Sequence, residues 1–224
     1  MTPLAYAPGI DALPETLPIF PLAGVLLLPR GRLPLNIFEP RYLAMTRDAI
    51  AGDHLIGMVQ PLDAASEGEP QPAVYRTGCT GRITDLKETD DGRYLIILTG
   101  LCRFTIAGEL PLNESGYRRV RVVYGVFADD LGPADDSAVD RVRLGRVLKD
   151  FFETGDEVAI DWRSIERTPS ESLVVSLSMT LPFSPSEKQA LLEARDLAER
   201  TGILISLMEM MAAQEQTGAA ARVQ

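Results

Sequence analysis

The chain has 224 residues, of which 46% are hydrophobic, so it can form one large domain or two small ones around a substantial core. A formal net charge of −10 at pH 7 argues against a protein whose main ligand is a nucleic-acid backbone. Two cysteines, Cys79 and Cys102, are too few for a disulfide framework. They favour two reduced thiols, with a single disulfide as the alternative if their strands pair.

The N-terminal sequence MTPLAYAPGIDALPETLP has neither the basic start nor the apolar stretch of a signal peptide. The longest apolar runs, GVLLLP and GILISLMEMMAA, are shorter than the roughly 20 residues that a membrane-spanning helix needs. We therefore expect a soluble, cytoplasmic protein that does not contact a membrane.

The first half of the chain predicts a β domain. Residues 1–14 are rich in Pro and Ala and are expected to be loosely ordered, and residues 15–128 are predicted to form a compact, barrel-like domain. Its short apolar runs, LPIFPL, GVLLLP and RLPLNIF, indicate strands and kinks rather than a helix, because Pro recurs too often for a helix interior. One helix is predicted from Pro40 to Gly52, since Pro is tolerated in a first turn and Gly commonly follows a last one.

The clearest local signal in this domain is a hairpin. Two β-rich runs flank Asp90, Asp91 and Gly92, and an Asp-Gly step between strands is typical of a tight turn. The preceding RTGCTGR lacks the G-x-x-x-x-G-K-[ST] pattern of a phosphate-binding loop and opens no helix. Its glycines indicate bulges or turns in a curved sheet.

The second half predicts helices. Residues 129–136 form an acidic stretch with Gly and Pro that we interpret as a linker, and residues 137–212 have the period of a bundle of three or four helices. Residues 213–224 are expected to be a frayed tail. The predicted fold class is therefore α+β, with a barrel-type β domain followed by a small α-helical bundle.

Three helix starts are indicated by capping sequences. TPSE from Thr168 and SPSE from Ser184 each place a hydroxyl cap, a Pro and a Glu in the order of a capping box. The stretch from Asp196 to Glu199 repeats this order with an Asp cap.

Residues that could carry catalysis are sparse. His54 is the one histidine and neither cysteine belongs to a C-x-x-C pair, so no metal cluster is indicated. No G-x-S-x-G elbow occurs. A Ser–Lys dyad would need one of three lysines predicted in a hairpin or on helix surfaces, which are Lys87, Lys149 and Lys188. We expect no enzyme activity, no metal and no cofactor.

The junction FEPRY is a first candidate contact surface. Phe38, Arg41 and Tyr42 could form an aromatic and cationic patch of the kind that anchors protein partners. The alternative is that the two rings close the barrel and that Arg41 pairs with Glu39.

The last predicted helix is a second candidate, because it is apolar nearly all round. Met208 and Met211 belong to it, and methionine suits adaptable contacts. A helix of this kind either lies at the centre of its bundle or covers a partner, which could be a second copy of the chain.

The succession of these motifs along the chain resembles that of the N-terminal substrate-binding domain of Lon-type ATP-dependent proteases. The resemblance runs from LPIFPLAGVLLLPRGRLPLNIFEPRY through YRTGCTGRITDLKETDDGRYLIILTGLCRFTI to ESLVVSLSMTLPFSPSEKQALLEARDLAERTGILISLMEM. It implies a PUA-like β domain, a helical bundle and recognition of unfolded or flexible polypeptides. It also implies that FEPRY fixes the angle between a strand and its helix, which favours the packing alternative.

The sequence contains neither the P-loop nor the Ser–Lys protease of complete Lon enzymes. The resemblance therefore implies a non-catalytic, stand-alone recognition domain in protein quality control or regulated proteolysis, with polypeptide clients and full-length Lon protease as partners. The alternative is a PUA-like RNA-binding module, which the net charge disfavours. Its basic stripe would consist of Arg103, Arg118, Arg119 and Arg121. A hydrolase, the third class considered, lacks an activated nucleophile.

Overall fold

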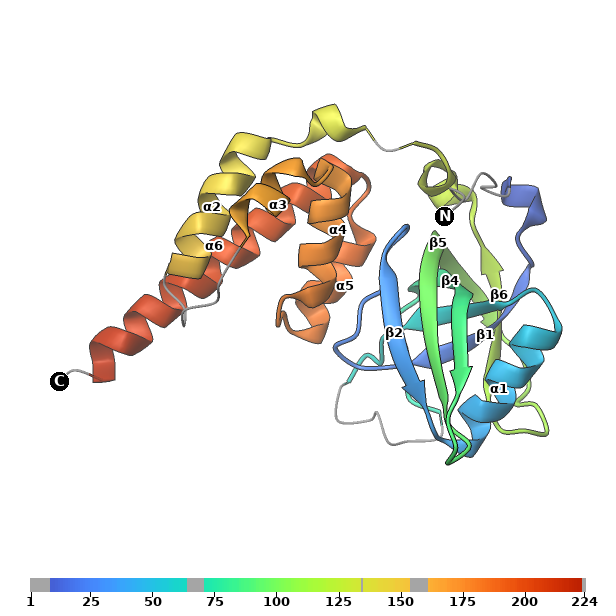
Figure 1. Cartoon of the computed structure of the whole chain (residues 1–224). Helices are drawn as coiled ribbons and strands as arrows, with labels where there is room; N and C mark the ends of the chain where they lie inside the picture. The colour runs from blue at the N-terminus through green and yellow to red at the C-terminus, as the bar shows by residue number, and fades with distance from the viewer. Residues whose placement is uncertain (1–8, 64–70, 134, 154–160, 223–224) are drawn as a thin grey trace. The chain divides into compact units, whose positions relative to one another are not determined.

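A computed structural model describes residues 9–63, 71–133, 135–153 and 161–222. The chain divides into two compact units, Met1–Pro133 and Ala134–Gln224. Figure 1 shows the first unit as a curved β-sheet with one α-helix, and the second as a group of helices.

The β-sheet of the first unit closes on itself. Its described elements are β1 (Thr16–Pro21), β2 (Arg32–Ile37), α1 (Pro40–Ala51), β3 (Leu55–Val59), β4 (Thr77–Glu88), β5 (Tyr94–Glu109) and β6 (Arg118–Val123). The strand order is β2-β5-β4-β3-β1-β6, and β6 also pairs with β5. Five strands thus form a ring to which β2 is added at the edge, and this confirms the predicted barrel-type domain.

The ring closes because β5 is 16 residues long and has different neighbours along its length. Its first part pairs with β2 and its last part with β6, while β4 pairs with β5 from Tyr94 to Thr105. Register shifts in the β4–β5 hairpin, one of them at Gly81, are the irregularities that bend a sheet. The predicted turn is confirmed, and Gly92 adopts a φ of +78° there, which glycine tolerates without strain.

Gly100 allows the segment before β2 to cross β5 closely. A Cβ atom at Gly100 would lie 2.0 Å from the backbone oxygen of Leu28. The amide of Arg30 donates to the oxygen of Gly100 at 2.8 Å, and the amide of Gly100 donates to the oxygen of Gly31 at 2.9 Å. The backbone of Leu28 is so close to Gly100 that position 100 has no room for a side chain.

The core of the β unit lies inside the barrel around Phe104, which is fully buried. Its buried members are Leu13, Leu17, Ile19, Leu55, Val59, Cys102, Phe104, Ile106, Val120, Val122 and Tyr124. Leu13 follows a short 3-10 helix, Ile10–Ala12, so the described part of the segment expected to be loose is ordered. Burial of an apolar side chain supplies the reason, because it ties the segment to the core.

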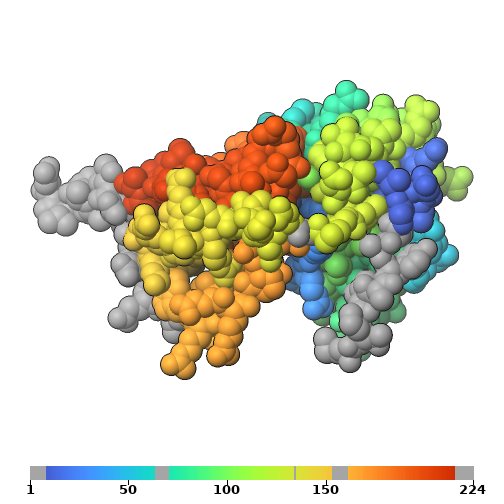
Figure 2. Space-filling view, turned by 90° about the horizontal axis from the view of Figure 1, so that it is seen from above, coloured from blue at the N-terminus to red at the C-terminus, as the bar shows by residue number. Residues whose placement is uncertain are grey.

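The second unit is a helical bundle, as predicted. Its described helices are a 3-10 turn (Asp136–Ala138), α2 (Arg141–Glu153), α3 (Trp162–Arg167), α4 (Ser170–Thr180), α5 (Pro185–Glu193) and α6 (Leu197–Arg222). Helix α6 contacts α2, α4 and α5, and Figure 2 shows α2 (yellow) lying along α6 (red). Leu144, Leu148, Leu204 and Met208 are completely buried.

Two of the three predicted helix caps are confirmed. Ser184 and Glu187 form the complete capping box of α5, and the amide of Glu199 donates to Asp196 at 2.8 Å. The cap predicted at Thr168 is wrong, because Thr168 instead donates its hydroxyl to the Ser164 oxygen at the end of α3.

The start of α4 is held from another part of the sequence. Pro169 occupies the cap position without a side-chain hydrogen bond, and the amide of Glu171 donates to a carboxylate oxygen of Asp136 at 2.8 Å. A distant aspartate thus satisfies an amide that the local sequence leaves unpaired.

Two stretches differ from the sequence expectations. Asp130, placed in the linker, is 2.8 Å from the guanidinium of Arg103 and belongs to the β unit. Helix α6 continues to Arg222 through the stretch expected to be frayed. The alanines and glutamines of that stretch favour helix, which accounts for its continuation.

Candidate functional site

One face of strands β2, β5 and β4 points away from the core. Along β5, Tyr94, Ile96 and Leu98 are buried, whereas Leu95 is 43% exposed and Ile97 is half-buried. Successive side chains of a strand point to opposite faces. Leu95 and Ile97 therefore lie on the face that the barrel core does not cover.

Neighbouring strands complete this face. Leu95 is paired with Asn36 of β2 and Lys87 of β4, and directly paired residues lie on one face of a sheet. We call this surface the outer sheet face and define it by its paired residues and the aromatic residue after β2: Pro34, Asn36, Phe38, Asp85, Lys87, Leu95 and Ile97.

Phe38 is the predicted site residue with a largely exposed ring, at 60% exposure. Ile37 pairs with Tyr94, so Phe38 and Arg93 lie one step further along the same two strands. The guanidinium of Arg93 lies 5.8 Å from the centre of the Phe38 ring. An exposed aromatic beside exposed aliphatic side chains is typical of an interaction surface.

The outer sheet face carries charges of both signs. Asp85 and Lys87 lie on β4, and Arg93 pairs with Asp91 at 2.9 Å at the hairpin turn. The hydroxyl of Thr89, which donates to Asp91, lowers the pKa of that carboxyl, with a smaller contribution from Arg93. The surface therefore offers apolar contact without a strong preference for the charge of its ligand.

The other two junction residues make local contacts. Tyr42 is 6% exposed, and its ring centre lies 4.1 Å from that of Phe20. The guanidinium of Arg41 lies 4.6 Å from the Tyr42 ring and 2.9 Å from the Glu39 carboxylate. Tyr42 thus packs α1 against β1, and these contacts are those of the packing alternative.

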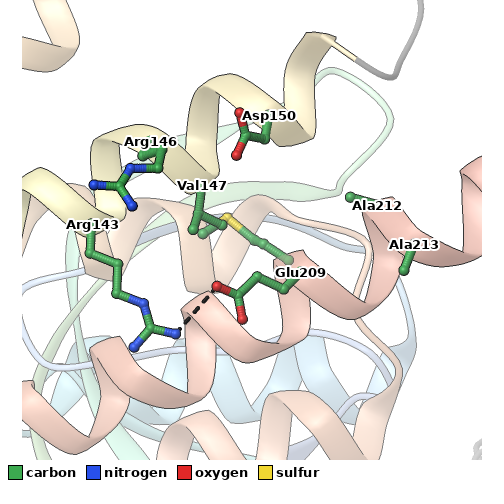
Figure 3. Close-up of a pocket in the computed structure, with 8 residues that line it drawn as sticks. Arg143, Arg146, Val147, Asp150, Glu209, Ala212 and Ala213 are labelled. Carbon is green, nitrogen blue, oxygen red and sulfur yellow. Dashed lines mark hydrogen bonds and ion pairs between the residues drawn. The ribbon is translucent and has the colours of Figure 1, made fainter.

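The two methionines lie in the helical unit. Met208 is completely buried and Met211 is half-buried. Met208 also lines a cleft of about 350 Å³ between α2 and α6, across which Arg143 and Glu209 form an ion pair at 3.2 Å (Figure 3). Met208 is therefore part of the bundle core.

Half of the predicted basic stripe is neutralised within the β unit. Arg103 donates to Asp130, and Arg118 donates to the two carboxylate oxygens of Glu109 at 2.6 and 2.9 Å. Arg121 is exposed and Arg119 is half-buried. With two of the four cations held by carboxylates, β5 and β6 do not present a stripe of four free positive charges to a phosphate backbone.

The cysteines are buried free thiols rather than a disulfide. Their strands do pair, but Cys79 is opposite Arg103, and Cys102 is opposite Thr80. Burial raises the pKa of the Cys102 thiol to about 12, with a further contribution from Asp130. A thiol of this kind is a poor nucleophile near neutral pH.

The remaining candidate catalytic residues are dispersed. His54 is exposed directly before β3, with a φ of 60°. The described residues contain no group of three or more His, Cys, Asp or Glu side chains that could hold a metal. Lys188, expected on a helix surface, is 7% exposed, and burial lowers its pKa.

Sequence reasoning missed Leu95 and Ile97 as surface residues. The run YLIIL, from Tyr94 to Leu98, is apolar at every position, so its period does not distinguish the core face from the outer one. The signal lies in the partners, because Asn36 and Lys87 are polar, but it can be read only once the strand pairing is known.

Comparison with known proteins identifies one family. The family model for the ATP-dependent protease La (LON) substrate-binding domain matches residues 16–210. Lon protease 2 of Myxococcus xanthus is 27% identical over 216 residues, which cover 92% of this chain and 25% of that protein. Lon protease of Anaeromyxobacter dehalogenans is 26% identical over 204 residues, 88% of this chain and 23% of that protein. The chain thus spans about a quarter of the length of these relatives.

Two solved structures have a similar fold. A Lon N-terminal domain protein from Xanthomonas campestris has a TM-score of 0.60 and 25% identity, and the match covers 85% of this chain and 97% of that one. The N-terminal domain of a Lon protease from the Mycobacterium avium complex has a TM-score of 0.62 and 16% identity, covering 87% and 98%. In the described part of the chain, no helix combines the length and hydropathy needed to cross a bilayer.

Proposed function

The chain belongs to the family of ATP-dependent protease La (LON) substrate-binding domains, and we propose from this premise that it binds flexible polypeptides on its outer sheet face. The observation that carries the proposal is the exposure of Phe38 and Leu95 beside Ile97 on adjoining strands. Exposure of these apolar side chains to water is unfavourable, and an apolar partner that covers them removes this free-energy cost.

The binding mode that we propose uses side chains rather than strand addition. Strand β2 lies at the edge of the sheet, where an extended peptide could add a further strand. Pro34 lies in the middle of β2, lacks an N–H donor and so weakens this edge as a template. A client would therefore place its apolar side chains across Leu95, Ile97 and Phe38.

The combination of exposed apolar side chains with charges of both signs on this face fits broad recognition. Apolar contact accepts many side chains, because it requires no particular pattern of hydrogen bonds. We propose that this binding serves protein quality control or regulated proteolysis together with a Lon protease, and that the chain itself does not hydrolyse peptide bonds.

The proposal is tested by measuring the fluorescence anisotropy of a labelled, reduced and carboxymethylated polypeptide, which cannot fold. Replacing both Phe38→Ser and Leu95→Ser should weaken its binding roughly tenfold, because two apolar contacts are lost. The matched control is Val126→Ser, since Val126 is 83% exposed in the same unit but follows β6. Equal affinity of the double variant and the control would remove the outer sheet face from the proposal.

A further inference from the structure

A second concave surface lies between α2 and α3, entirely within the helical unit. We call it the α2–α3 cleft. It measures about 410 Å³, and its lining includes Arg141, Val142, Arg146 and Lys149 of α2 and Trp162 and Ile165 of α3. A volume of this order accommodates a large side chain with its neighbouring backbone.

The floor of the α2–α3 cleft is apolar and partly open to solvent. Val142 is 75% exposed although it lies on an otherwise amphipathic helix. Trp162 and Ile165 of α3 are half-buried, and Leu173 of α4 is buried beneath them. The indole therefore presents part of its surface to the cleft, where an apolar side chain could displace water.

The rim of the cleft is positively charged, although the chain carries a net charge of −10. The described residues that line the cleft include three cations, Arg141, Arg146 and Lys149, and one carboxylate, Glu166. Within the described residues Arg146 makes no hydrogen bond or ion pair, and Lys149 contacts the Trp162 ring at 5.7 Å. These two cations are thus available to a ligand.

Arg141 holds the cleft in shape. Its guanidinium donates to the backbone oxygens of Ile165 and Thr168, and so fixes the end of α3 to the start of α2. The Nη1 atom of the same guanidinium is shielded from solvent and has no hydrogen-bond partner among the described residues. The cleft is therefore supported by a side chain that retains a positive charge close to its floor.

The neighbouring cleft between α2 and α6 has the opposite character. Its described lining holds two cations, Arg143 and Arg146, and two carboxylates, Asp150 and Glu209, and the Arg143–Glu209 ion pair crosses the opening (Figure 3). Cations and carboxylates are thus equal in number in this lining, whereas Arg146 also lines the α2–α3 cleft, where cations are in excess. Only the α2–α3 cleft of these two combines an apolar floor with an excess of positive charge.

We propose that the α2–α3 cleft binds an acidic polypeptide segment in which one large apolar side chain is flanked by carboxylates. The apolar side chain packs against Val142, Trp162 and Ile165, and the carboxylates approach Arg146 and Lys149. Charge complementarity selects this partner, since a basic segment would meet three like charges. The site is separate from the outer sheet face and extends the proposed recognition to a second class of segment.

Trp162 is the one tryptophan of the chain, so its fluorescence reports on this cleft directly. The probe is a blocked pentapeptide with leucine between two pairs of glutamates, titrated into the full chain at low ionic strength. A saturable change in emission is expected. Peptides with lysines in place of the glutamates, or alanine in place of the leucine, should bind at least about tenfold more weakly.

Variants then distinguish the rim from general electrostatics. Arg146→Glu with Lys149→Glu should weaken binding of the acidic peptide by about tenfold or more. Arg163→Glu with Arg167→Glu is the matched control, because both arginines are exposed on α3, do not line the cleft and change the net charge equally. Circular-dichroism melting curves check that each double variant is folded.

Three results would overturn the proposal: no saturable response to the acidic peptide, equal loss of affinity in the two double variants, or tighter binding of a single-stranded 15-nucleotide DNA than of the peptide. The last would identify the cleft as a nucleic-acid site. The double variant Phe38→Ser and Leu95→Ser, which alters the outer sheet face, should leave the Trp162 fluorescence titration unchanged. Failure of the cleft proposal can therefore be distinguished from failure of the proposed function of the outer sheet face.

Discussion

At the scale of single residues, Arg103 shows how a cation suggestive of nucleic-acid binding serves packing instead. The Asp130 carboxylate accepts hydrogen bonds from the Arg103 backbone and guanidinium at 2.8 to 2.9 Å. The guanidinium also lies 4.4 Å from the centre of the Phe127 ring. This pair attaches the segment after β6 to β5 and leaves little of either charge in solvent.

Asp130→Ala is expected to lower the free energy of unfolding by about 3 to 5 kcal/mol, because it leaves a buried guanidinium without its carboxylate. Urea denaturation measures the change. Asp129→Ala is the control, since Asp129 is exposed and its backbone oxygen alone accepts a hydrogen bond, and a change within about 0.5 kcal/mol is expected. Equal effects would mean that the ion pair contributes nothing specific.

The Cys102 thiol should be inert in the folded protein. Burial raises its pKa to about 12, above the ordinary value of 9.0, so almost no thiolate forms at pH 8. Alkylation by iodoacetamide at pH 8 should therefore be slow in buffer and fast in denaturant, as followed by mass spectrometry of the Cys102 peptide. Fast alkylation of the native protein would contradict the burial described.

The same shift has a consequence for stability. A folded-state pKa above the unfolded one means that the native protein holds this proton more tightly. The stabilisation that the protonated Cys102 thiol adds to the free energy of unfolding is complete below about pH 9. It declines as the pH rises towards 12. Cys102→Ala should remove part of this alkaline decline in urea denaturation, and an unchanged slope would assign the decline to other groups.

At the scale of elements, replacing a glycine by alanine is expected to have opposite effects at two positions of the chain. Gly100→Ala places a methyl group 2.0 Å from the Leu28 oxygen and should cost about 3 kcal/mol or more, because backbone must move. Gly202→Ala lies in α6 with open space around it and should stabilise the chain by about 0.5 to 1 kcal/mol. Thermal unfolding of both variants checks the sign, and destabilisation by Gly202→Ala would be inconsistent with the structure.

The helix caps provide a second test at this scale. Ser184→Ala should cost about 1 kcal/mol, because the capping box of α5 is complete. Thr168→Ala should lower the free energy of unfolding by less, because the Thr168 hydroxyl donates to the Ser164 oxygen and caps no amide of α4. Urea denaturation compares the two, and a larger loss for Thr168→Ala would support the cap read from TPSE.

The elements also show what the sequence can and cannot predict. The proline-broken runs LPIFPL and RLPLNIF, the Asp-Gly turn and the SPSE cap are local signals, and each predicted its element. The prediction for GVLLLP is wrong, because residues 24–29 form no strand although Leu26, Leu27 and Leu28 are buried. The closure of β5 onto β6 and the cap from Asp136 to α4 depend on residues distant in sequence, so no local pattern reveals them. The exposed position of Leu95 was hidden for the same reason, because strand pairing decides which face of YLIIL is covered.

At the scale of the whole molecule, the two units each bury their own core and each present a distinct surface. The outer sheet face of the first unit is apolar with mixed charge, whereas the α2–α3 cleft of the second is apolar with positive charge. We propose that each surface binds its own class of polypeptide segment.

The most direct test of the central claim is photocrosslinking of an unfolded client from single positions of the full chain. A photoreactive amino acid would be placed in turn at position 95, on the outer sheet face, and at position 126, which is exposed outside it. We predict strong, competable crosslinks of a reduced and carboxymethylated polypeptide from position 95 and few from position 126. Equal crosslinking from both positions, or none from position 95, would contradict the assignment of the outer sheet face as the binding surface.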